Sequence, residues 1–571
     1  MTGAQNLAEV DMGSDSEEEE GETGMIDTTG KKKKKKAVEK EMDIEDEAVK
    51  DRWSRYIGAM GIEAVAKQAS AKIFLSGAGA LGIEIAKNIV LAGCKQFTLH
   101  DTQPITQRDL SGQFFLSATD KQKSRSEACA NRLQALNLYV RCKTAPSERL
   151  PLTPEDLDKE PWNFSQYDVV ILTECDYETI CAVNEYCHAR GKKFMCADAV
   201  GVFGRLFNDF GDKFEVLDQN GEELQDVLIK KISCEEKGVV EILPTAKHKF
   251  QDGDEVHFTD ITGMKLREGQ KHEDPDCKSD SINDTIHKVE VITPYSFKVG
   301  DTTKYTEYEG NGIGKQLRMK LIMDFKPFGP TMLAGHETLP QDMNLSFADF
   351  EKPDNNILAH IAYEALDRFK RDKKAMPKAW DLVDATDFVA LCKEISERYE
   401  MKPAEWKNDG VELKLLHLFT FQSQGVFNPL CAFFGGFVAQ EIIKAITQKF
   451  SPTKQLFYYD CSEVLPDFDY EKHVVAGGDK DFFEKEYMTK MVKAREVGHR
   501  SDGLRICVGE ALVNELAHCR LFMVGAGAIG CELLKNYAMC GVGVGKDTKD
   551  RKGGAIFVTD PDIIENSNLN R

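Results

Sequence analysis

The chain has 571 residues and a formal net charge of −21 at pH 7, with 42% hydrophobic and 30% charged residues. This length is too great for one hydrophobic core and predicts about three to five domains. The acidic balance argues against nucleic-acid binding, which needs a basic face. No membrane span or signal peptide is expected, because no apolar run approaches the roughly 18 residues that a bilayer requires. The sixteen cysteines form no C-x-x-C pair, so a reducing compartment, cytoplasmic and nuclear, is predicted.

Residues 1–50 are predicted to be a disordered, charged tail, since they hold 15 acidic residues and 8 lysines and few large apolar groups. Six of the lysines form the run Lys31–Lys36. Such a run is typical of a nuclear-import signal, and equally of a solvated stretch of charge.

An α/β pattern begins at Lys72. The apolar run 72–76 predicts a buried strand that enters the loop Gly77-Ala78-Gly79-Ala80-Leu81-Gly82, and a helix is predicted over 83–92. A second strand, 96–100, ends at Asp101. Further strand and helix signals lie at 167–173, 181–190 and 193–197. Alternating strands and helices predict a doubly wound parallel sheet.

The pattern changes near Arg205. Short alternating segments divided by turn dipeptides such as Asn220-Gly221 predict a small β-barrel over 205–302. Residues from about 315 to 412 then have mostly helical periodicity, for instance 356–373 and 385–399. An apolar helix, 432–446, and a strand, 455–460, follow.

The first unit is repeated near the end of the chain. Arg520 to Gly530, with Gly525-Ala526-Gly527-Ala528-Ile529-Gly530, mirrors the segment from Lys72. The offset is 448 at the glycines (525 minus 77) and 459 at the aspartates (560 minus 101). A polar loop, 545–554, can hold the eleven inserted residues. A repeat with one loop insertion indicates an internal duplication. The repeat extends upstream of the loops, because each loop is preceded by an arginine at a similar distance: Arg55 lies 22 residues before the first loop and Arg500 lies 25 residues before the second.

A lone G-x-G-x-x-G loop is a weak signal. It is typical of dinucleotide binding, with Asp101 or Asp560 on a ribose hydroxyl, but also of ATP binding or of a tight turn without ligand. The segments after the two aspartates favour ATP for one copy. The second copy has Asp560, Asp562, Asn568 and Arg571, a set suited to a ribose, magnesium and triphosphate.

The first copy differs at three of these positions. Asp562 aligns with Gln103, Asn568 with Asp109 and Arg571 with Gly112. An acid therefore stands where an anion would lie, and electrostatic repulsion disfavours triphosphate there. The sequence predicts one copy that binds ATP and one that does not.

The segment Ser567-Asn568-Leu569-Asn570-Arg571, together with the second glycine loop, resembles ubiquitin-activating enzymes of the single-chain type. The resemblance covers about residues 50–571 and includes Leu206-Phe207-Asn208-Asp209-Phe210-Gly211 and Thr293-Pro294-Tyr295-Ser296-Phe297. It implies an inactive adenylation domain paired with an active one. The fold class expected is α/β, with duplicated doubly wound nucleotide-binding domains, the second truncated, and an inserted small β-barrel and helical bundle.

The resemblance divides the chain as follows: a disordered tail (1–50), the first part of an inactive adenylation domain (51–204), a first catalytic-cysteine half-domain that is a β-barrel (205–302), a four-helix bundle (303–413), the second part of the inactive domain (414–490) and the start of an active adenylation domain (491–571).

The function that the resemblance implies is ATP-dependent activation of ubiquitin as a C-terminal acyl-adenylate and then a thioester. The ATP-binding residues would be Arg55, which the inactive half extends to the phosphates, and Gly525, Ala526, Gly527, Gly530, Asp560, Asp562, Asn568 and Arg571. Asp562 would lie near Mg²⁺. The partners would be ubiquitin or a ubiquitin-like protein and, for the full-length protein, ubiquitin-conjugating enzymes. No nucleic-acid or membrane partner is expected.

The sequence stops at Arg571, inside the motif, and none of the sixteen cysteines matches the catalytic one. Cys531, just after the loop, is interpreted as a packing residue. The chain is therefore expected to be a truncated form that makes no thioester alone. The alternative is a non-catalytic subunit that docks ubiquitin or complements an activating enzyme. An NAD-dependent oxidoreductase is disfavoured by the Asn-Leu-Asn-Arg segment.

Overall fold

The computed structural model describes residues 46–272, 277–333, 355–399, 411–465 and 498–564. They all belong to the compact unit Glu41–Arg571. Residues 1–45 of the predicted tail, with Lys31–Lys36, lie outside the described residues. The end of that predicted tail is helical, however: α1 (Glu47–Arg52) begins where the Asp46 carboxylate accepts a hydrogen bond from the Ala48 N–H. An N-cap of this kind satisfies one of the free amides at a helix start.

The first glycine loop belongs to a seven-stranded sheet of the described residues, with the order β18-β6-β5-β4-β1-β2-β3. The parallel strands are β1 (Lys72–Ser76), β2 (Gln96–His100), β3 (Arg141–Thr144), β4 (Val169–Leu172) and β5 (Lys193–Val200). Two antiparallel strands, β6 (Phe203–Asp209) and β18 (Leu456–Asp460), extend it at one edge. The predicted doubly wound sheet is therefore present, and β1 and β2 have the predicted bounds.

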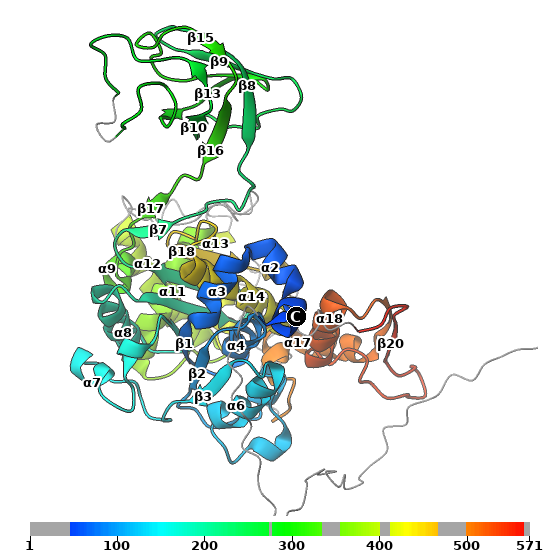
Figure 1. Ribbon diagram of the computed structural model, residues 1–571. Coiled ribbons are helices and arrows are strands. Elements are labelled where there is room, and N and C mark those ends of the chain that lie inside the picture. The colour runs from blue at the N-terminus through cyan, green and yellow to red at the C-terminus, as the bar shows by residue number, and fades with distance from the viewer. Residues whose placement is uncertain (1–45, 273–276, 334–354, 400–410, 466–497, 565–571) are drawn as a thin grey trace, which may run out of the picture. The chain divides into compact units, whose positions relative to one another are not determined.

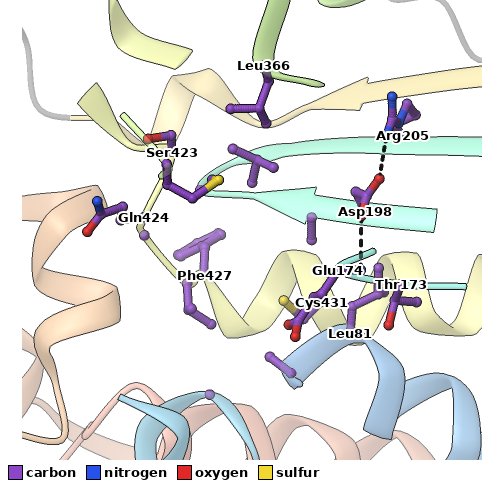
Figure 2. A pocket seen from close by; sticks show the side chains of 18 of the residues that line it. Leu81, Thr173, Glu174, Asp198, Arg205, Leu366, Ser423, Gln424, Phe427 and Cys431 are labelled. Atoms are coloured by element: carbon purple, nitrogen blue, oxygen red, sulfur yellow. Dashed lines mark hydrogen bonds and ion pairs between the residues drawn. The ribbon is translucent and has the colours of Figure 1, made fainter. Parts of the chain in front are cut away.

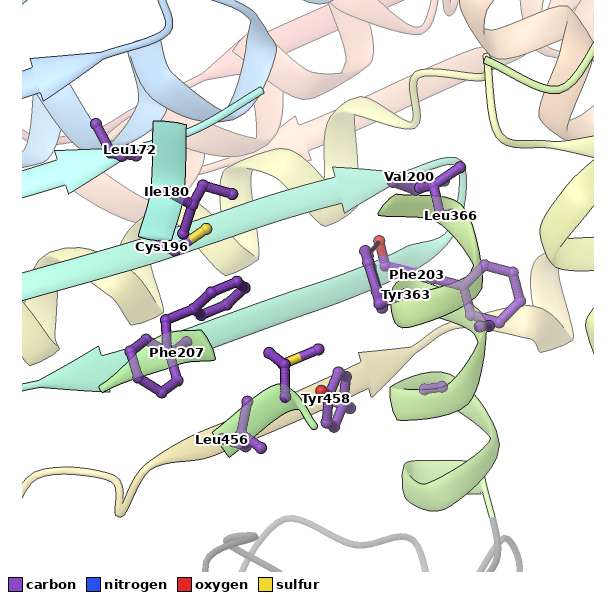
Figure 3. Close-up of a cluster of buried hydrophobic side chains, with 14 of the residues drawn as sticks. Leu172, Ile180, Cys196, Val200, Phe203, Phe207, Tyr363, Leu366, Leu456 and Tyr458 are labelled. Atoms are coloured by element: carbon purple, nitrogen blue, oxygen red, sulfur yellow. Dashed lines mark hydrogen bonds between the residues drawn. The ribbon is translucent and has the colours of Figure 1, made fainter. Parts of the chain in front are cut away.

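The strands read as continuous apolar runs because both faces of the sheet are covered. Ile73 and Leu75 point into one hydrophobic core, and Phe74 points into the other. Figure 3 shows the core that contains Leu172 and Phe207, which the helical segment with Tyr363 covers. Side chains that alternate between two cores fix the register of each strand.

Helices surround this sheet (Figure 1). Those on the chain before the β-rich insertion are α2 (Ser54–Met60), α3 (Ile62–Ser70), α4 (Ala80–Ala92), α5 (Asp109–Gly112), α6 (Arg125–Leu136), α7 (Pro154–Asp158) and α8 (Tyr177–Ala189). Short 3-10 turns lie at Ala118–Asp120, Phe164–Gln166, Glu397–Tyr399 and Ser462–Val464.

The β-rich insertion starts later and ends later than the predicted 205–302. Arg205 lies inside β6, which pairs with both β5 and β18. Its guanidinium is buried between Asp198 and Asp367. The insertion also includes residues beyond 302, because β16 (Ile313–Leu317) lies between two of its strands.

The insertion is an antiparallel sheet with the order β12-β10-β16-β8-β9-β14-β13. Its strands are β8 (Asp226–Ile232), β9 (Val239–Ile242), β10 (Glu255–Thr259), β12 (Ile286–Lys288), β13 (Glu290–Thr293), β14 (Ser296–Lys298) and β16. The two end strands, β12 and β13, are separated in the chain only by Val289, so the sheet curls back on itself around one core, as in a small barrel. Smaller pairs are β7 (Phe214–Val216) with β17 (Leu321–Met323), and β11 (Thr262–Gly263) with β15 (Tyr308–Gly310).

Helices follow β17 rather than residue 302. Those described are α9 (Phe328–Met332), α11 (Asn355–Lys373), α12 (Leu382–Ser396) and α13 (Val411–Phe421). Helix α13 passes the predicted limit of 413. Side chains of α11 and α12 join the core that covers one face of the main sheet, so the helices complete that domain rather than standing apart from it.

Helix α14 (Asn428–Thr447) is long and apolar enough to cross a membrane, with a hydropathy of 1.4. It is not an uninterrupted apolar run, because Gln440, Glu441 and Lys444 lie within it. Of its most apolar window, 61% is buried, and Gly435 lies against the backbone of α4 at Glu84. This burial is typical of a core helix of a folded domain.

The second copy repeats the first in structure. It consists of α17 (Asp502–His518), β19 (Arg520–Val524), α18 (Ala528–Met539) and β20 (Ala555–Thr559). Strand β19 pairs with β20 in parallel, as β1 pairs with β2. Gly77 and Gly525 have φ values of 99° and 100°. The inserted residues fall between α18 and β20, in agreement with the predicted loop.

The equivalent positions before the two glycine loops are occupied by glycines, not by Arg55 and Arg500. Gly61 ends α2 with φ 84° and ψ 151°, and Gly509 breaks α17 with φ 80° and ψ 163°. Both precede their loop by 16 residues (77 minus 61, and 525 minus 509). At this offset Arg55 is equivalent to Gly503, so the predicted pairing of Arg55 with Arg500 is wrong. Glycine is required there because other residues rarely adopt a positive φ.

Two ion pairs join α4 of the first copy to α18 of the second. Lys87 Nζ lies 2.5 Å from Glu532 Oε1, and Lys535 Nζ lies 2.5 Å from Glu84 Oε1. At the offset of 448, Glu84 is equivalent to Glu532 and Lys87 to Lys535. The two contacts therefore exchange under a twofold rotation, as in the isologous interface of a homodimer. The two copies pair about a pseudo-twofold axis.

Candidate nucleotide site

The glycine loop of the second copy connects β19 to α18. Gly527 is the N-cap of α18, and no side chain caps this helix among the described residues. A Cβ built at Gly530 would lie 2.2 Å from the carbonyl oxygen of Gly525, so this position accepts only glycine. The loop and the first turn of α18 border a hollow of about 370 Å³. Free amides at a helix start attract anions such as phosphate.

Asp560 follows β20 and lies beside this loop. Its carboxylate accepts hydrogen bonds from the backbone N–H groups of Ala526, at 2.5 Å, and Asp562, at 2.9 Å. These two hydrogen bonds lower the pKa of Asp560 below its ordinary value. An exposed, ionised carboxylate fixed at the end of a strand suits the hydroxyl groups of a ribose. The Ala526 and Gly527 loop therefore fits a nucleotide, with phosphates at α18 and ribose at Asp560.

The described residues support a magnesium site less strongly than a nucleotide site. Asp562 is exposed, and its carboxylate accepts from the N–H of Ile563. Within the described ranges no group of three or more His, Cys, Asp or Glu side chains has the arrangement of a metal site. Magnesium commonly takes one or two carboxylates and completes its shell with phosphates and water, so Asp562 fits an ion that arrives with ATP.

The structure brings together six of the predicted site residues: Gly525, Ala526, Gly527, Gly530, Asp560 and Asp562. Arg55 is elsewhere, on α2, where it lines a separate hollow of about 370 Å³ with Tyr56, Asn88 and Gln440. Asn568 and Arg571 lie outside the described residues. Cys531 is exposed and its Sγ lies 3.0 Å from the carbonyl oxygen of Ala526, so its interpretation as a packing residue is wrong. Its place on the open first turn of α18 explains the difference.

The first copy has the same frame around its loop. The Asp101 carboxylate accepts from the N–H groups of Ala78, at 2.5 Å, and Gln103, at 2.6 Å. These bonds match those of Asp560 with Ala526 and Asp562. A cavity of about 460 Å³ opens beside the loop at the carboxyl ends of β4 and β5 (Figure 2). In a doubly wound sheet this edge is where ligands bind.

Two side chains that were not among the predicted site residues, Glu174 and Arg125, lie at the first loop. A Cβ built at Gly79 would lie 1.8 Å from Glu174 Oε1. The Arg125 guanidinium contacts Glu174 Oε2 at 2.7 Å, Asp101 at 2.9 Å and Asp109 at 3.2 Å. Burial alone would lower the pKa of Arg125, but these carboxylates raise it, so it remains charged. The signal available in the sequence was the polar residue Glu174 just past a buried strand, at the edge where ligands bind.

The second loop differs at this point. A Cβ built at Gly525 or Gly527 meets no described atom within 4 Å. In the first copy the atoms beside Gly77 and Gly79 belong to Thr173 and Glu174, which follow β4. The described part of the second copy contains only the counterparts of β1 and β2. The asymmetry of the two copies stays a prediction, to which the first copy adds Glu174 beside Asp109.

A known protein family matches nearly all of this arrangement. The ThiF family matches residues 53–471 and 502–571, and the chain belongs to this family. It is 34% identical over 523 residues to ubiquitin-like modifier-activating enzyme 6 of Mus musculus, which covers 91% of this chain and 44% of that protein. It is also 34% identical over 521 residues to ubiquitin-activating enzyme E1 1 of Candida albicans, covering 91% of this chain and 45% of that one. The resemblance predicted from the second glycine loop is confirmed.

The chain spans a little under half the length of these relatives. For ubiquitin-like modifier-activating enzyme 1 of Dictyostelium discoideum the identity is 34% over 538 residues, 94% of this chain and 47% of the relative. Among solved structures, E. coli MccB with succinimide is 22% identical with a TM-score of 0.24 and covers 27% of this chain and 47% of MccB.

Proposed function

We propose that this chain takes part in the ATP-dependent activation of ubiquitin or a ubiquitin-like protein, and that its second glycine loop holds the nucleotide. The proposal is supported by membership of the ThiF family and by relatives named as activating enzymes of ubiquitin or ubiquitin-like modifiers. The observation that carries it is the site at the second loop, where the start of α18 lies beside Asp560, whose carboxylate is fixed by the N–H groups of Ala526 and Asp562.

In the reaction proposed, an oxygen of the C-terminal carboxylate attacks the α-phosphorus of ATP. The new bond joins carboxylate to AMP, and the bond that breaks releases pyrophosphate. A cysteine thiolate then takes the acyl group and AMP leaves. An anionic nucleophile must approach an anionic phosphate, so positive groups must offset their repulsion. Here the amides at the start of α18 would hold phosphate and Asp560 would bind the ribose. Asp562 would lie near the magnesium ion.

The roles of the remaining predicted residues are part of the same proposal. Asn568 and Arg571 would hold the triphosphate, and Arg55 would reach it from the first copy. Because Arg55 lines a hollow next to α14, this role requires its side chain to turn away from Gln440. Ubiquitin-conjugating enzymes are proposed as partners of the activated product, and the cytoplasm and nucleus as the sites of action.

Matched variants of the two copies test the nucleotide site. Asp560→Asn removes a carboxylate that would bind ribose, and Asp101→Asn makes the same change in the first copy. Hydrogen bonds to a charged group are worth about 1.5–3 kcal/mol, so Asp560→Asn should weaken ATP binding, measured by titration calorimetry, at least about tenfold. Asp101→Asn should leave ATP affinity unchanged. Equal effects of the two variants would contradict the assignment of ATP to the second copy.

ATP–pyrophosphate exchange in the presence of ubiquitin tests the reaction. Exchange by the chain alone would support an adenylating enzyme. Exchange only after addition of the C-terminal half of a relative would support the alternative, a complementing subunit. A non-reducing gel after incubation with ubiquitin and ATP shows whether any of the sixteen cysteines carries a thioester. If neither arrangement exchanges pyrophosphate with ubiquitin or a ubiquitin-like protein, the proposal is wrong.

A further inference from the structure

Glu174 occupies the glycine loop of the first copy in an unusual backbone conformation. Its φ is 57°, in the left-handed region that residues other than glycine adopt at a cost in free energy. Its N–H donates to Asp198 Oδ1 at 3.2 Å, a contact that Figure 2 shows beside the cavity. This conformation directs the carboxylate to Gly79, where Oε1 lies 1.8 Å from the position of a built Cβ. The side chain therefore takes the space that a close approach to the loop requires.

Arg125 fixes this carboxylate. Its guanidinium lies 2.7 Å from Glu174 Oε2 and also binds Asp101 and Asp109. One positive charge is thus shared by three carboxylates around the loop. Arg125 Nε is buried and has no hydrogen-bond acceptor among the described residues. Arg125 thus contacts three carboxylates and retains one donor without an acceptor in the described part of the chain.

The surroundings of Glu174 still have the features of a nucleotide site. Helix α4 starts at the N-cap Gly79, with no side-chain cap in the described residues. Asp101 is fixed by the same two backbone bonds as its counterpart in the second copy. The adjoining cavity of about 460 Å³ has Leu81 and Phe427 among its apolar walls. Its volume lies within the range of small-ligand pockets, roughly 300–1,000 Å³.

The Glu174 carboxylate lies at Gly79, the start of α4, where the free amides of a helix attract phosphate. We propose that the first copy contains a latent site for a nucleoside monophosphate, and that Glu174 is the internal anion that keeps it closed. Asp109 lines the same cavity as Glu174. It restricts the ligand to few phosphates, because a longer phosphate chain would bring more negative charge towards the Asp109 carboxylate. The closed loop directs nucleotide to the second copy.

The test uses the full chain with Asp560→Asn, so that the second copy does not obscure binding to the first. In this background Glu174→Gly removes the carboxylate and accepts a φ of 57° without strain. Glu174→Gln keeps the bulk of the side chain and serves as the matched control. We expect Glu174→Gly to bind AMP at least about tenfold tighter than the parent by titration calorimetry, a gain of about 1.4 kcal/mol. The Gln variant, which keeps the bulk but lacks the negative charge, should bind AMP less tightly than the Gly variant.

Two further variants locate the gained binding and guard against loss of folding. Adding Asp101→Asn to Glu174→Gly should abolish the gain, because it removes the ribose acceptor of the first copy. Glu174→Asn, which tolerates the left-handed region and is one methylene shorter, should reproduce the gain if the Gly variant does not fold, as checked by thermal unfolding.

A folded Gly or Asn variant that binds AMP no better than the parent would overturn the proposal, as would a gain that survives Asp101→Asn. Neither result depends on ATP–pyrophosphate exchange. The latent site and the proposed function can therefore fail separately.

Discussion

Glu84 and Lys87 of the first copy and Glu532 and Lys535 of the second form a ring of charges between the two copies. The two ion pairs that cross from one copy to the other have the same N–O distance but differ in burial, so they test how burial affects the strength of an ion pair. Both Lys535–Glu84 and Lys87–Glu532 have N–O distances of 2.5 Å. The side chain of Glu84 is only 6% exposed, whereas that of Glu532 is 47% exposed. Burial alone would raise the pKa of Glu532, but Lys535 and Lys87 hold it below its usual value. Glu532 is therefore ionised at neutral pH and contributes its charge to the ring.

The expected coupling energies follow from this difference. A hydrogen-bonded pair that is shielded from water contributes about 1.5–3 kcal/mol, whereas a half-exposed pair is discounted to about 0.2–1 kcal/mol. We expect the Lys535–Glu84 pair to couple by about 2–3 kcal/mol and the Lys87–Glu532 pair by about 1 kcal/mol or less. Lys535→Met alone should destabilise the contact by about 1.5–3 kcal/mol, because Glu84 loses its partner across the interface but keeps Lys87 at 3.0 Å.

Two double-mutant cycles measure these terms: Lys535→Met with Glu84→Gln, and Lys87→Met with Glu532→Gln. A chain of this size does not unfold in two states, so the local opening free energy is measured by native-state hydrogen exchange of the α18 amides. Lys123→Met, at a lysine whose side chain is 58% exposed, is the control and should change the result by less than about 0.5 kcal/mol. Coupling energies that are equal, or in the opposite order, would refute the link between burial and strength at this interface.

Two further predictions concern single side chains. Burial lowers the pKa of His360 to about 3; unfolding restores an ordinary value near 6.5, so stability should fall by about 1.4 kcal/mol per unit as pH drops from about 6.5 towards 3. His360→Gln should flatten this dependence in thermal unfolding at pH 7.5 and 5.5, and parallel profiles would contradict the prediction. Gly530→Ala should abolish ATP binding, because its Cβ would lie 2.2 Å from the Gly525 carbonyl oxygen. Gly58→Ala, in open space on α2, should be neutral or stabilise by up to about 1 kcal/mol.

The sheet around the first loop could be predicted because its signals are local. Strands buried on both faces read as apolar runs, so β1 and β2 have the predicted bounds. The glycine loop fixed the turn between β1 and α4, and the duplication gave the second copy without any further signal. These features depend on residues that are close in sequence, where hydrophobic pattern and turn chemistry carry the information.

The errors fall where long-range contacts decide. The β-rich insertion was predicted to start at Arg205 from a change in local pattern, yet Arg205 belongs to the main sheet, where Asp367, 162 residues away, completes its buried ion pairs. Glu174 follows a strand, but its role depends on a positive φ and on Arg125, 49 residues earlier. Neither property is visible in a local pattern. The glycines at 61 and 509 were missed for the same reason, since sequence shows a glycine but not its φ.

The two copies agree in the residues that join them and in the frame of each loop, and a physical argument explains why Glu174 can lie in the first loop without disturbing either. In a pseudo-twofold contact Glu84 and Lys87 must meet Lys535 and Glu532, so a change in one copy leaves a charge in the other without its partner. The frame of each loop is similarly constrained, because Asp101 and Asp560 each fix two amides of their own copy. The side chain inside the first loop, in contrast, contacts only its own copy among the described residues. Glu174 could therefore occupy the first loop without disturbing the pairing, as the proposed latent site requires.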